Sequence, residues 1–131
     1  MAVTREDLWR LRSYNERLRS LERQKEQLRD AVTNMTQRLT GMPSGGDGHD
    51  RMMAFVARLD ELEARYADLI AEQAEARLQV ERALLLLPEQ QERVLRLRYI
   101  EGLSWKKIGK IMHYDVSTLI RKHKNALKKL E

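Results

Sequence analysis

The strongest constraint on how this chain can fold is a pair of apolar seams with heptad spacing, separated by a short glycine-rich break. The first seam alternates steps of three and four residues and comprises Leu11, Tyr14, Leu18, Leu21, Lys25, Leu28, Val32, Met35 and Leu39. The second keeps the same alternation and comprises Phe55, Leu59, Leu62, Tyr66, Leu69, Gln73, Ala76, Val80, Ala83 and Leu87. This spacing predicts two long helices, each with one apolar stripe.

The break at residues 41–49 contains one proline and four glycines. We expect it to be a linker between helices at about residues 3–40 and 50–87, with Asp47 or Asp50 capping the second helix. Two helices of equal length joined by a turn favour an antiparallel, coiled-coil-like hairpin over residues 1–87. The same seams could instead pair between chains, so we also expect a homo-oligomer, with a dimer favoured.

Residues 88–131 are expected to form a second, smaller domain. Pro88 suits the first position of a new helix, which should end near Gly102. Ser104 and Asp115 are good N-caps for two further helices, at residues 105–112 and 116–130.

The last two helices, with the turn between them, have the lengths of a helix-turn-helix motif. We expect Gly109 to let the second of these helices approach closely. The first helix should bury Ile108, Ile111 and Met112. The predicted fold class is therefore all-α, with a long antiparallel helical hairpin followed by a small helix-turn-helix domain.

Charge is distributed unevenly along the chain. Residues 88–131 hold eleven basic and five acidic residues, a net charge of +6. Residues 1–40 carry +3 and residues 41–87 carry −4. The excess positive charge lies on the predicted helix-turn-helix, which indicates a polyanionic partner such as double-stranded DNA.

Several other function classes find no support in the sequence. There is no cysteine, and the histidines at 49, 113 and 123 are too far apart to suggest a metal site. No glycine-rich phosphate loop, nucleophile–base pair or cluster of metal-binding carboxylates is present. No apolar run approaches the ~20 residues of a membrane span. We therefore expect a cytoplasmic protein that is not an enzyme, has no cofactor or metal and does not contact a membrane.

Three segments of the last third of the chain carry a family resemblance. Residues 87–99 (LPEQQERVLRLRY) resemble the opening of region 4 of sigma-70-type factors, and residues 104–109 (SWKKIG) resemble the first helix of its DNA-binding motif. Residues 126–130 (ALKKL) resemble its closing helix. The resemblance implies a DNA-binding domain whose second motif helix enters the major groove.

A wider resemblance covers most of the chain. Gly41-Met42-Pro43, followed by Gly45-Gly46 and Asp50, lies between two long helices and before a region 4-like end. This arrangement is similar to phage and prophage transcriptional regulators of the RinA type. The resemblance implies a regulator in a bacterial host cell, with RNA polymerase as a further candidate partner.

The predicted recognition helix, residues 116–130, supplies the candidate base-reading residues. Its outward positions are Val116, Ser117, Ile120, Arg121 and Lys124. This pattern departs from sigma factors, which use mostly charged and amide side chains there, whereas two of these five are apolar. Apolar side chains can contact thymine methyl groups, and an arginine can bond guanine. We therefore expect a target site different from a promoter −35 element.

A second set of residues is expected to contact the DNA phosphates, which positions a protein without reading sequence. These candidates are Lys106, Lys107, Lys110, Thr118, Lys122, Lys128 and Lys129. We expect the aromatic residues Tyr99, Trp105 and Tyr114 to be core residues instead, and His123 to be a half-buried packing residue.

The hypothesis that follows is a sequence-specific DNA-binding transcriptional regulator of phage or prophage origin. Two alternatives stay open at this point. One is a DNA-packaging protein similar to a small terminase subunit, which would assemble into a ring. The other is an RNA polymerase-binding adaptor that uses the apolar Val116 and Ile120 to contact protein.

Overall fold

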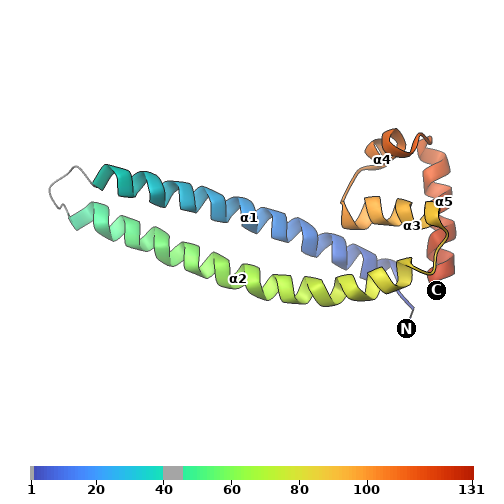
Figure 1. Cartoon of the computed structure of the whole chain (residues 1–131), viewed down its shortest axis with the longest axis horizontal. Helices are drawn as coiled ribbons and strands as arrows, with labels where there is room; N and C mark the ends of the chain where they lie inside the picture. The colour runs from blue at the N-terminus through green and yellow to red at the C-terminus, as the bar shows by residue number, and fades with distance from the viewer. Residues whose placement is uncertain (1, 40–45) are drawn as a thin grey trace. The chain divides into compact units, whose positions relative to one another are not determined.

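The computed structural model describes residues 2–39 and 46–131, and within them it contains helices and no strand. The elements are α1 (Arg5–Leu39), α2 (Gly46–Leu84), α3 (Glu89–Leu95), the π-helical turn η1 (Arg96–Ile100), α4 (Trp105–Met112) and α5 (Val116–Leu130). The two long helices pack against each other and are followed by a small helical domain (Figure 1). The predicted fold class is confirmed.

Helix α1 begins with a reciprocal cap that fixes its first turn. The Thr4 amide donates to Oδ2 of Asp7 at 2.9 Å, and the Asp7 amide donates to Oγ1 of Thr4 at 3.3 Å. This arrangement satisfies amides that have no carbonyl partner at a helix start. It places the helix start two residues later than the expected position 3.

Helix α2 is shifted toward the N-terminus relative to the prediction. It begins at Gly46 and ends at Leu84, whereas the sequence suggested residues 50–87. Asp47 and Asp50 therefore lie within α2 and are not its N-cap. A helical glycine costs only about 1 kcal/mol relative to alanine, so a few glycines do not prevent a long packed helix from extending through them. The rest of the expected linker, residues 41–45, lies outside the described residues.

The C-terminal end of α2 comes early because the chain must turn before Pro88. The amides of Leu86 and Leu87 donate to the carbonyls of Ala83 and Leu84, each three residues back. This tight turn buries Leu84 and Leu87 and leaves Leu85 75% exposed. Pro88 is the N-cap of α3, one position before the predicted one.

The chain divides into two compact units, and Arg17–Ile70 forms one of them. Here the pairing of α1 with α2 is antiparallel, since Lys25 meets Tyr66 and the later Arg29 meets the earlier Glu63. The Lys25 ammonium lies 4.1 Å from the centroid of the Tyr66 ring. This cation–π contact explains how a lysine that is only 7% exposed occupies a seam position.

The other unit combines Met1–Glu16 with Ala71–Glu131. Its main core joins the start of α1 and the end of α2 to the C-terminal helices. The buried residues are Val3, Leu8 and Leu11 from the N-terminal segment, Val80, Leu84 and Leu87 from α2 and its turn, and Leu95, Tyr99, Ile100, Ala126 and Leu130. One core therefore contains residues from both sides of the domain boundary that the sequence suggested between 87 and 88.

A second, smaller core belongs to the helix-turn-helix alone. Val94, Ile108 and Leu119 are completely buried at its centre. Half-buried side chains surround them, and these are Leu97, Leu103, Trp105, Met112 and Tyr114. The expected core roles of Trp105 and Tyr114 are thus confirmed.

The shared core leads to a test by truncation of one α1 side chain. Leu11 is completely buried, so Leu11→Ala should lower the free energy of unfolding of this unit by about 2–5 kcal/mol. Urea unfolding followed by tryptophan fluorescence measures this directly, because Trp9 and Trp105 both lie in the unit. The matched control is Leu85→Ala, which removes an exposed leucine and should change stability by less than about 0.5 kcal/mol. Equal stability of the two variants would show that α1 does not contribute to this core.

Candidate nucleic-acid interface

The helix-turn-helix is defined by two side-chain caps, both of which the sequence predicted. Oγ of Ser104 accepts the Lys107 amide at 3.3 Å and starts α4. Oδ1 of Asp115 accepts the Thr118 amide at 3.2 Å and starts α5. Each cap satisfies a free amide of the first turn and so determines where the helix begins.

The turn between α4 and α5 explains why residue 109 is glycine. The Tyr114 amide donates to the Gly109 carbonyl at 3.2 Å, and a Cβ at position 109 would lie 2.8 Å from the Tyr114 carbonyl oxygen. The close approach predicted at Gly109 is therefore made by the turn. From α5, Leu119 comes only to ordinary contact distance, 3.7 Å.

The inward face of α5 is the predicted one. Leu119, His123 and Ala126 are buried, and the five candidate base-reading residues are exposed: Val116, Ser117, Ile120, Arg121 and Lys124. Val116 is 41% and Ile120 37% exposed, which is high for β-branched apolar side chains. One face of α5 is thus free to meet a partner.

The prediction for the apolar face of α4 was partly wrong. Ile108 is buried and Met112 is half-buried, but Ile111 is 43% exposed. An eight-residue helix that packs against α5 and η1 on one side buries only a narrow stripe, and Ile108 occupies it. Ile111 therefore adds to the exposed apolar surface beside the turn.

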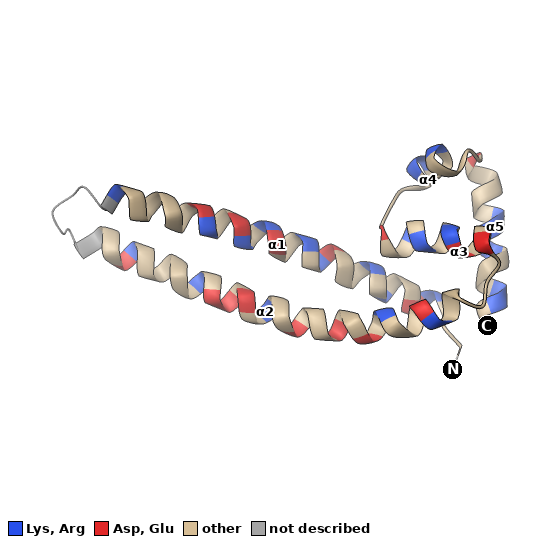
Figure 2. Cartoon of the chain, viewed as in Figure 1, with Lys and Arg blue, Asp and Glu red and all other residues tan. Residues whose placement is uncertain are grey.

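The candidate phosphate contacts fall into two groups. Five lysines are exposed and form no ion pair within the described part of the chain, and these are Lys106, Lys107, Lys110, Lys128 and Lys129. Figure 2 shows basic residues on α4 and α5, whereas acidic residues recur along α2. The positive charge of these five lysines is not neutralised, as a DNA-binding surface requires.

Lys122 and Thr118 differ from the other phosphate candidates. Nζ of Lys122 donates to Oε1 of Gln90 on α3 at 2.8 Å and lies 5.0 Å from the Tyr114 ring centroid. Thr118 is half-buried, and its amide is used by the Asp115 cap. The structure brings Lys122 against α3 and Tyr114, so it is less free to move toward a phosphate than the exposed lysines.

Behind the α4–α5 surface, an aromatic cluster centred on the buried Tyr99 and His123 connects η1, α4, α5 and α1. The Tyr99 hydroxyl lies 2.6 Å from Nε2 of His123, and the Tyr99 ring makes an edge contact with Trp9 at 5.4 Å between centroids. Trp105 meets the His123 ring at 5.1 Å. Tyr99 is 1% exposed, which confirms its expected packing role, and His123 is 6% exposed, so it is more buried than expected.

Burial changes the protonation of this cluster. Burial, together with the positive charges of Arg5 and Arg98, lowers the pKa of His123 to about 4. Burial also raises the pKa of the Tyr99 hydroxyl. At neutral pH the imidazole is therefore uncharged and can accept the proton of the Tyr99 hydroxyl in a hydrogen bond.

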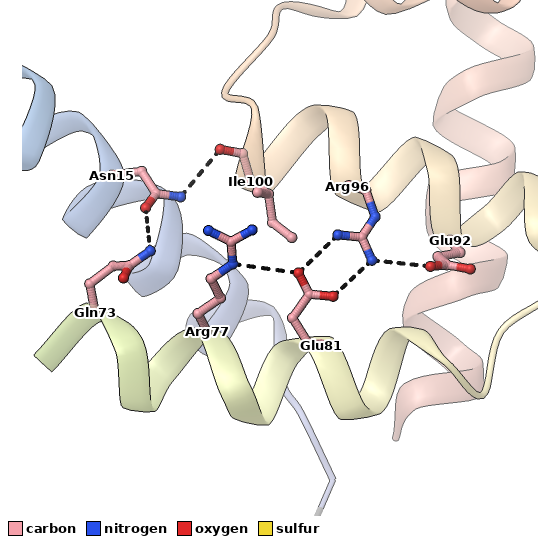
Figure 3. A network of polar contacts seen from close by, with 7 residues as sticks. All are labelled: Asn15, Gln73, Arg77, Glu81, Glu92, Arg96 and Ile100. Carbon is pink, nitrogen blue, oxygen red and sulfur yellow. Dashed lines mark hydrogen bonds and ion pairs between the residues drawn. The ribbon is translucent and has the colours of Figure 1, made fainter. Parts of the chain in front are cut away.

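The π-helical turn η1 positions the polar groups that join this domain to α1 and α2 (Figure 3). The Glu101 amide donates to the Arg96 carbonyl, five residues back, at 3.0 Å. Because η1 ends at Ile100, the carbonyl of this residue has no helical partner and accepts Nδ2 of Asn15 at 3.2 Å. Oδ1 of Asn15 in turn accepts Nε2 of Gln73 at 3.0 Å, so a seam glutamine that is 9% exposed has a partner.

An ion-pair network lies on the other side of η1. The Arg96 guanidinium donates to both carboxylate oxygens of Glu81, at 2.9 and 2.8 Å, and to Glu92 at 3.1 Å. Nε of Arg77 lies 3.5 Å from Glu81 as well. The hydrogen bonds from Arg96 hold the pKa of Glu81 below its usual range and raise the pKa of Arg96.

Sequence reasoning did not find the residues that attach α1 to this domain. Nη2 of Arg12 donates to the Gly102 carbonyl at 3.4 Å, and the Arg98 guanidinium lies between the rings of Trp9 and Trp105. The only available signals were polar residues at or beside the seams, such as Asn15 and Gln73. Their partners are more than 55 residues away in sequence, beyond the reach of local periodicity.

Comparison with protein families agrees with this geometry. Residues 77–130 match the family model described as Sigma-70, region 4. This part of the chain is therefore similar to sigma-70 region 4 domains, which are of the helix-turn-helix DNA-binding type. The match begins within α2, before Glu81, which supports including the end of α2 in the domain. No curated protein and no solved structure matches the chain.

Residues 2–39 and 46–131, which the structure describes, contain no group of three or more His, Cys, Asp or Glu residues arranged to hold a metal ion. None of the helices in these ranges is both long enough and apolar enough to cross a bilayer.

The buried imidazole predicts an acid-sensitive step in stability. An unfolded histidine titrates near 6.5 and the folded one near 4, so unfolding takes up a proton between these values. Stability should be complete above pH 6.5 and fall toward pH 4 by up to about 1.4 kcal/mol per pH unit. The carboxylates with lowered pKa, Glu81 and Asp115, have ordinary values of 4.5 and 3.8, so the stability that they contribute is lost mainly below about pH 4.5, at the acid end of this range.

The measurement is urea unfolding at pH values from 7.5 to about 4.5, compared with His123→Gln. Glutamine can still accept the Tyr99 hydrogen bond but cannot be protonated in this range. The variant should be less stable at neutral pH and should lack the decline between pH 6.5 and 4.5. An equal decline in both proteins would mean that another group is responsible.

Proposed function

We propose that this protein is a sequence-specific DNA-binding transcriptional regulator of phage or prophage origin. It acts as a binding protein and not as an enzyme, without a cofactor or metal. The observation that carries the proposal is a region similar to sigma-70 region 4, whose second motif helix presents an exposed face beside five lysines that form no ion pair with the residues that the structure describes. The resemblance to RinA-type regulators supports the phage origin.

In this proposal α5 enters the major groove with its N-terminal end first. Val116, Ser117, Ile120, Arg121 and Lys124 face the base edges, and the exposed lysines of α4 and α5 contact phosphates. Thr118 and Lys122 are placed at the edge of this surface. Lys122 would leave Gln90 to reach a phosphate.

We further propose that the protein binds DNA as a homodimer formed through the helical hairpin. The polar seam residues Gln73 and Lys25 have partners within the chain, namely Asn15 and Tyr66. The seam is therefore satisfied between α1 and α2, which supports a dimer surface elsewhere on the hairpin. Apolar side chains exposed on α2 offer such a surface. Met53 is 49% exposed and Leu78 is 51% exposed.

The experiment is selection of bound fragments from genomic DNA with the full-length protein at one fixed salt concentration, because phosphate-driven affinity changes steeply with salt. We expect one enriched sequence with two half-sites about 10 bp apart, or a multiple of that distance, as a two-fold dimer requires. Light scattering on the same sample gives the number of chains. Absence of any enriched sequence would contradict the proposal.

Two other outcomes would favour the alternatives. A ring of eight or more chains with enrichment at a packaging site would indicate a protein similar to a small terminase subunit. Co-purification with RNA polymerase, without DNA selectivity, would indicate an adaptor.

A single substitution tests the base-reading role of Arg121. The side chain is exposed, so Arg121→Ala should fold normally. It should weaken binding to the selected site by about 1–3 kcal/mol and leave non-specific binding nearly unchanged. The control is Lys128→Ala, which should weaken both kinds of binding alike and reduce the salt slope by about one. Unchanged affinity and selectivity of the arginine variant in a direct titration would remove Arg121 from the reading surface.

A further inference from the structure

Three exposed apolar side chains flank the turn of the helix-turn-helix. Ile111 lies at the end of α4 and is 43% exposed, and Val116 and Ile120 on the first two turns of α5 are 41% and 37% exposed. Ordinary surface positions of a basic domain rarely carry three β-branched apolar residues within ten residues of sequence. We name these three residues the apolar patch.

The polar groups next to the apolar patch are already used within the protein. The Ser117 hydroxyl donates to Oδ2 of Asp115 at 2.9 Å, and Oδ1 of the same carboxylate accepts the Thr118 amide. These hydrogen bonds hold the pKa of Asp115 below its usual range, so the carboxylate stays charged and keeps both donors at neutral pH. The only hydroxyl proton among the exposed reading positions is therefore not free for a base.

Few hydrogen-bonding side chains remain at the start of α5. Residues 116–122 read VSTLIRK and contain no asparagine or glutamine, the amides that usually bond adenine. Leu119 is buried, and Lys122 is held by Gln90. What this segment can present to a base edge is thus the apolar Val116 and Ile120, together with the charged Arg121.

The major groove offers one apolar group among the four standard bases, the 5-methyl group of thymine. We propose that Val116 and Ile120 read thymine methyl groups, so that methyl contacts add base specificity at the start of α5 beside any hydrogen bonds from Arg121. Ile111 is exposed on the other side of the turn, at the end of α4. This inference rests on the proposed function, since it specifies what the DNA-binding surface recognises.

Uracil provides the test, because it pairs as thymine does and differs only in lacking the methyl group. In the selected site, each thymidine is replaced in turn by deoxyuridine and the affinity of the full-length protein is measured. Loss of one buried methyl contact should weaken binding about fourfold, which corresponds to about 0.8 kcal/mol. We expect this loss at one or more thymines in each half-site.

Variants of the apolar patch show which side chain makes each contact. In Val116→Ala or Ile120→Ala, replacing the corresponding thymine by uracil should no longer weaken binding, because the contact with the methyl group is already missing. Both side chains are exposed, so both variants should fold. The control is Leu85→Ala, which removes an exposed leucine outside α4 and α5. In this variant, uracil should weaken binding at each thymine as much as it does in the unchanged protein.

The inference and the proposed function fail in different ways. If a site is selected but every uracil substitution is tolerated, or the two alanine variants keep the same losses, the methyl-reading inference is overturned while DNA binding stands. If no sequence is selected, the proposed function fails, and the inference fails with it. If the alanine variants bind DNA as the unchanged protein does but lose co-purification with RNA polymerase, the patch is a protein-binding surface and the inference is wrong.

Discussion

The burial of η1 between α1, α2 and α5 is the constraint on which the DNA-binding domain depends. Tyr99, in the middle of this turn, packs its ring against Trp9 of α1 and its hydroxyl against His123 of α5. Since His123 faces inward together with Leu119 and Ala126, the opposite side of α5, with Ser117, Arg121 and Lys124, faces outward. The orientation of the proposed reading surface thus follows from a core that includes the first turns of α1. A region 4 domain without that cover would expose Tyr99, Leu95 and Ile100 to water.

The polar contacts around η1 add little to the free energy of unfolding, but they determine how α3 is oriented relative to the ends of α1 and α2. The Arg96 and Glu81 side chains are about one-third exposed, and such ion pairs contribute at most about 1 kcal/mol, whereas each buried leucine contributes several times more. Their geometry is nevertheless specific, because a bidentate arginine–carboxylate pair accepts few relative orientations. Asn15 adds a second point of attachment, since it bonds the Ile100 carbonyl that the π-helical turn leaves without a helical partner. The two attachments together restrict rotation of α3 relative to the ends of α1 and α2.

Patterns in the sequence predicted the features of this structure that depend on interactions between residues close together in the chain. Heptad spacing predicted both seams, side-chain chemistry predicted the caps at Ser104 and Asp115, and helical periodicity predicted which face of α5 is buried.

The predictions were wrong or incomplete where contacts between distant parts of the chain determine whether a side chain is buried. Ile111 was expected inside because it is apolar, but α4 has room for one buried stripe. The contribution of α1 to the domain core depends on residues about 85 positions apart, such as Asn15 and Ile100, and no periodicity in one sequence reveals such a pairing. The candidate DNA-contact residues were predicted from motif and charge, and the structure adds that Lys122 and Ser117 already have partners.

The most direct test of the claim that α1 completes the DNA-binding domain is native-state hydrogen exchange of the full-length protein in low concentrations of urea. Amides of residues 8–16 and residues 94–100 should open with the same free energy and the same dependence on urea, because cooperative units of a fold exchange together. Fast, independent exchange of residues 8–16 while residues 94–100 stay protected would contradict the account. In that case α1 would lie beside the domain without being part of it.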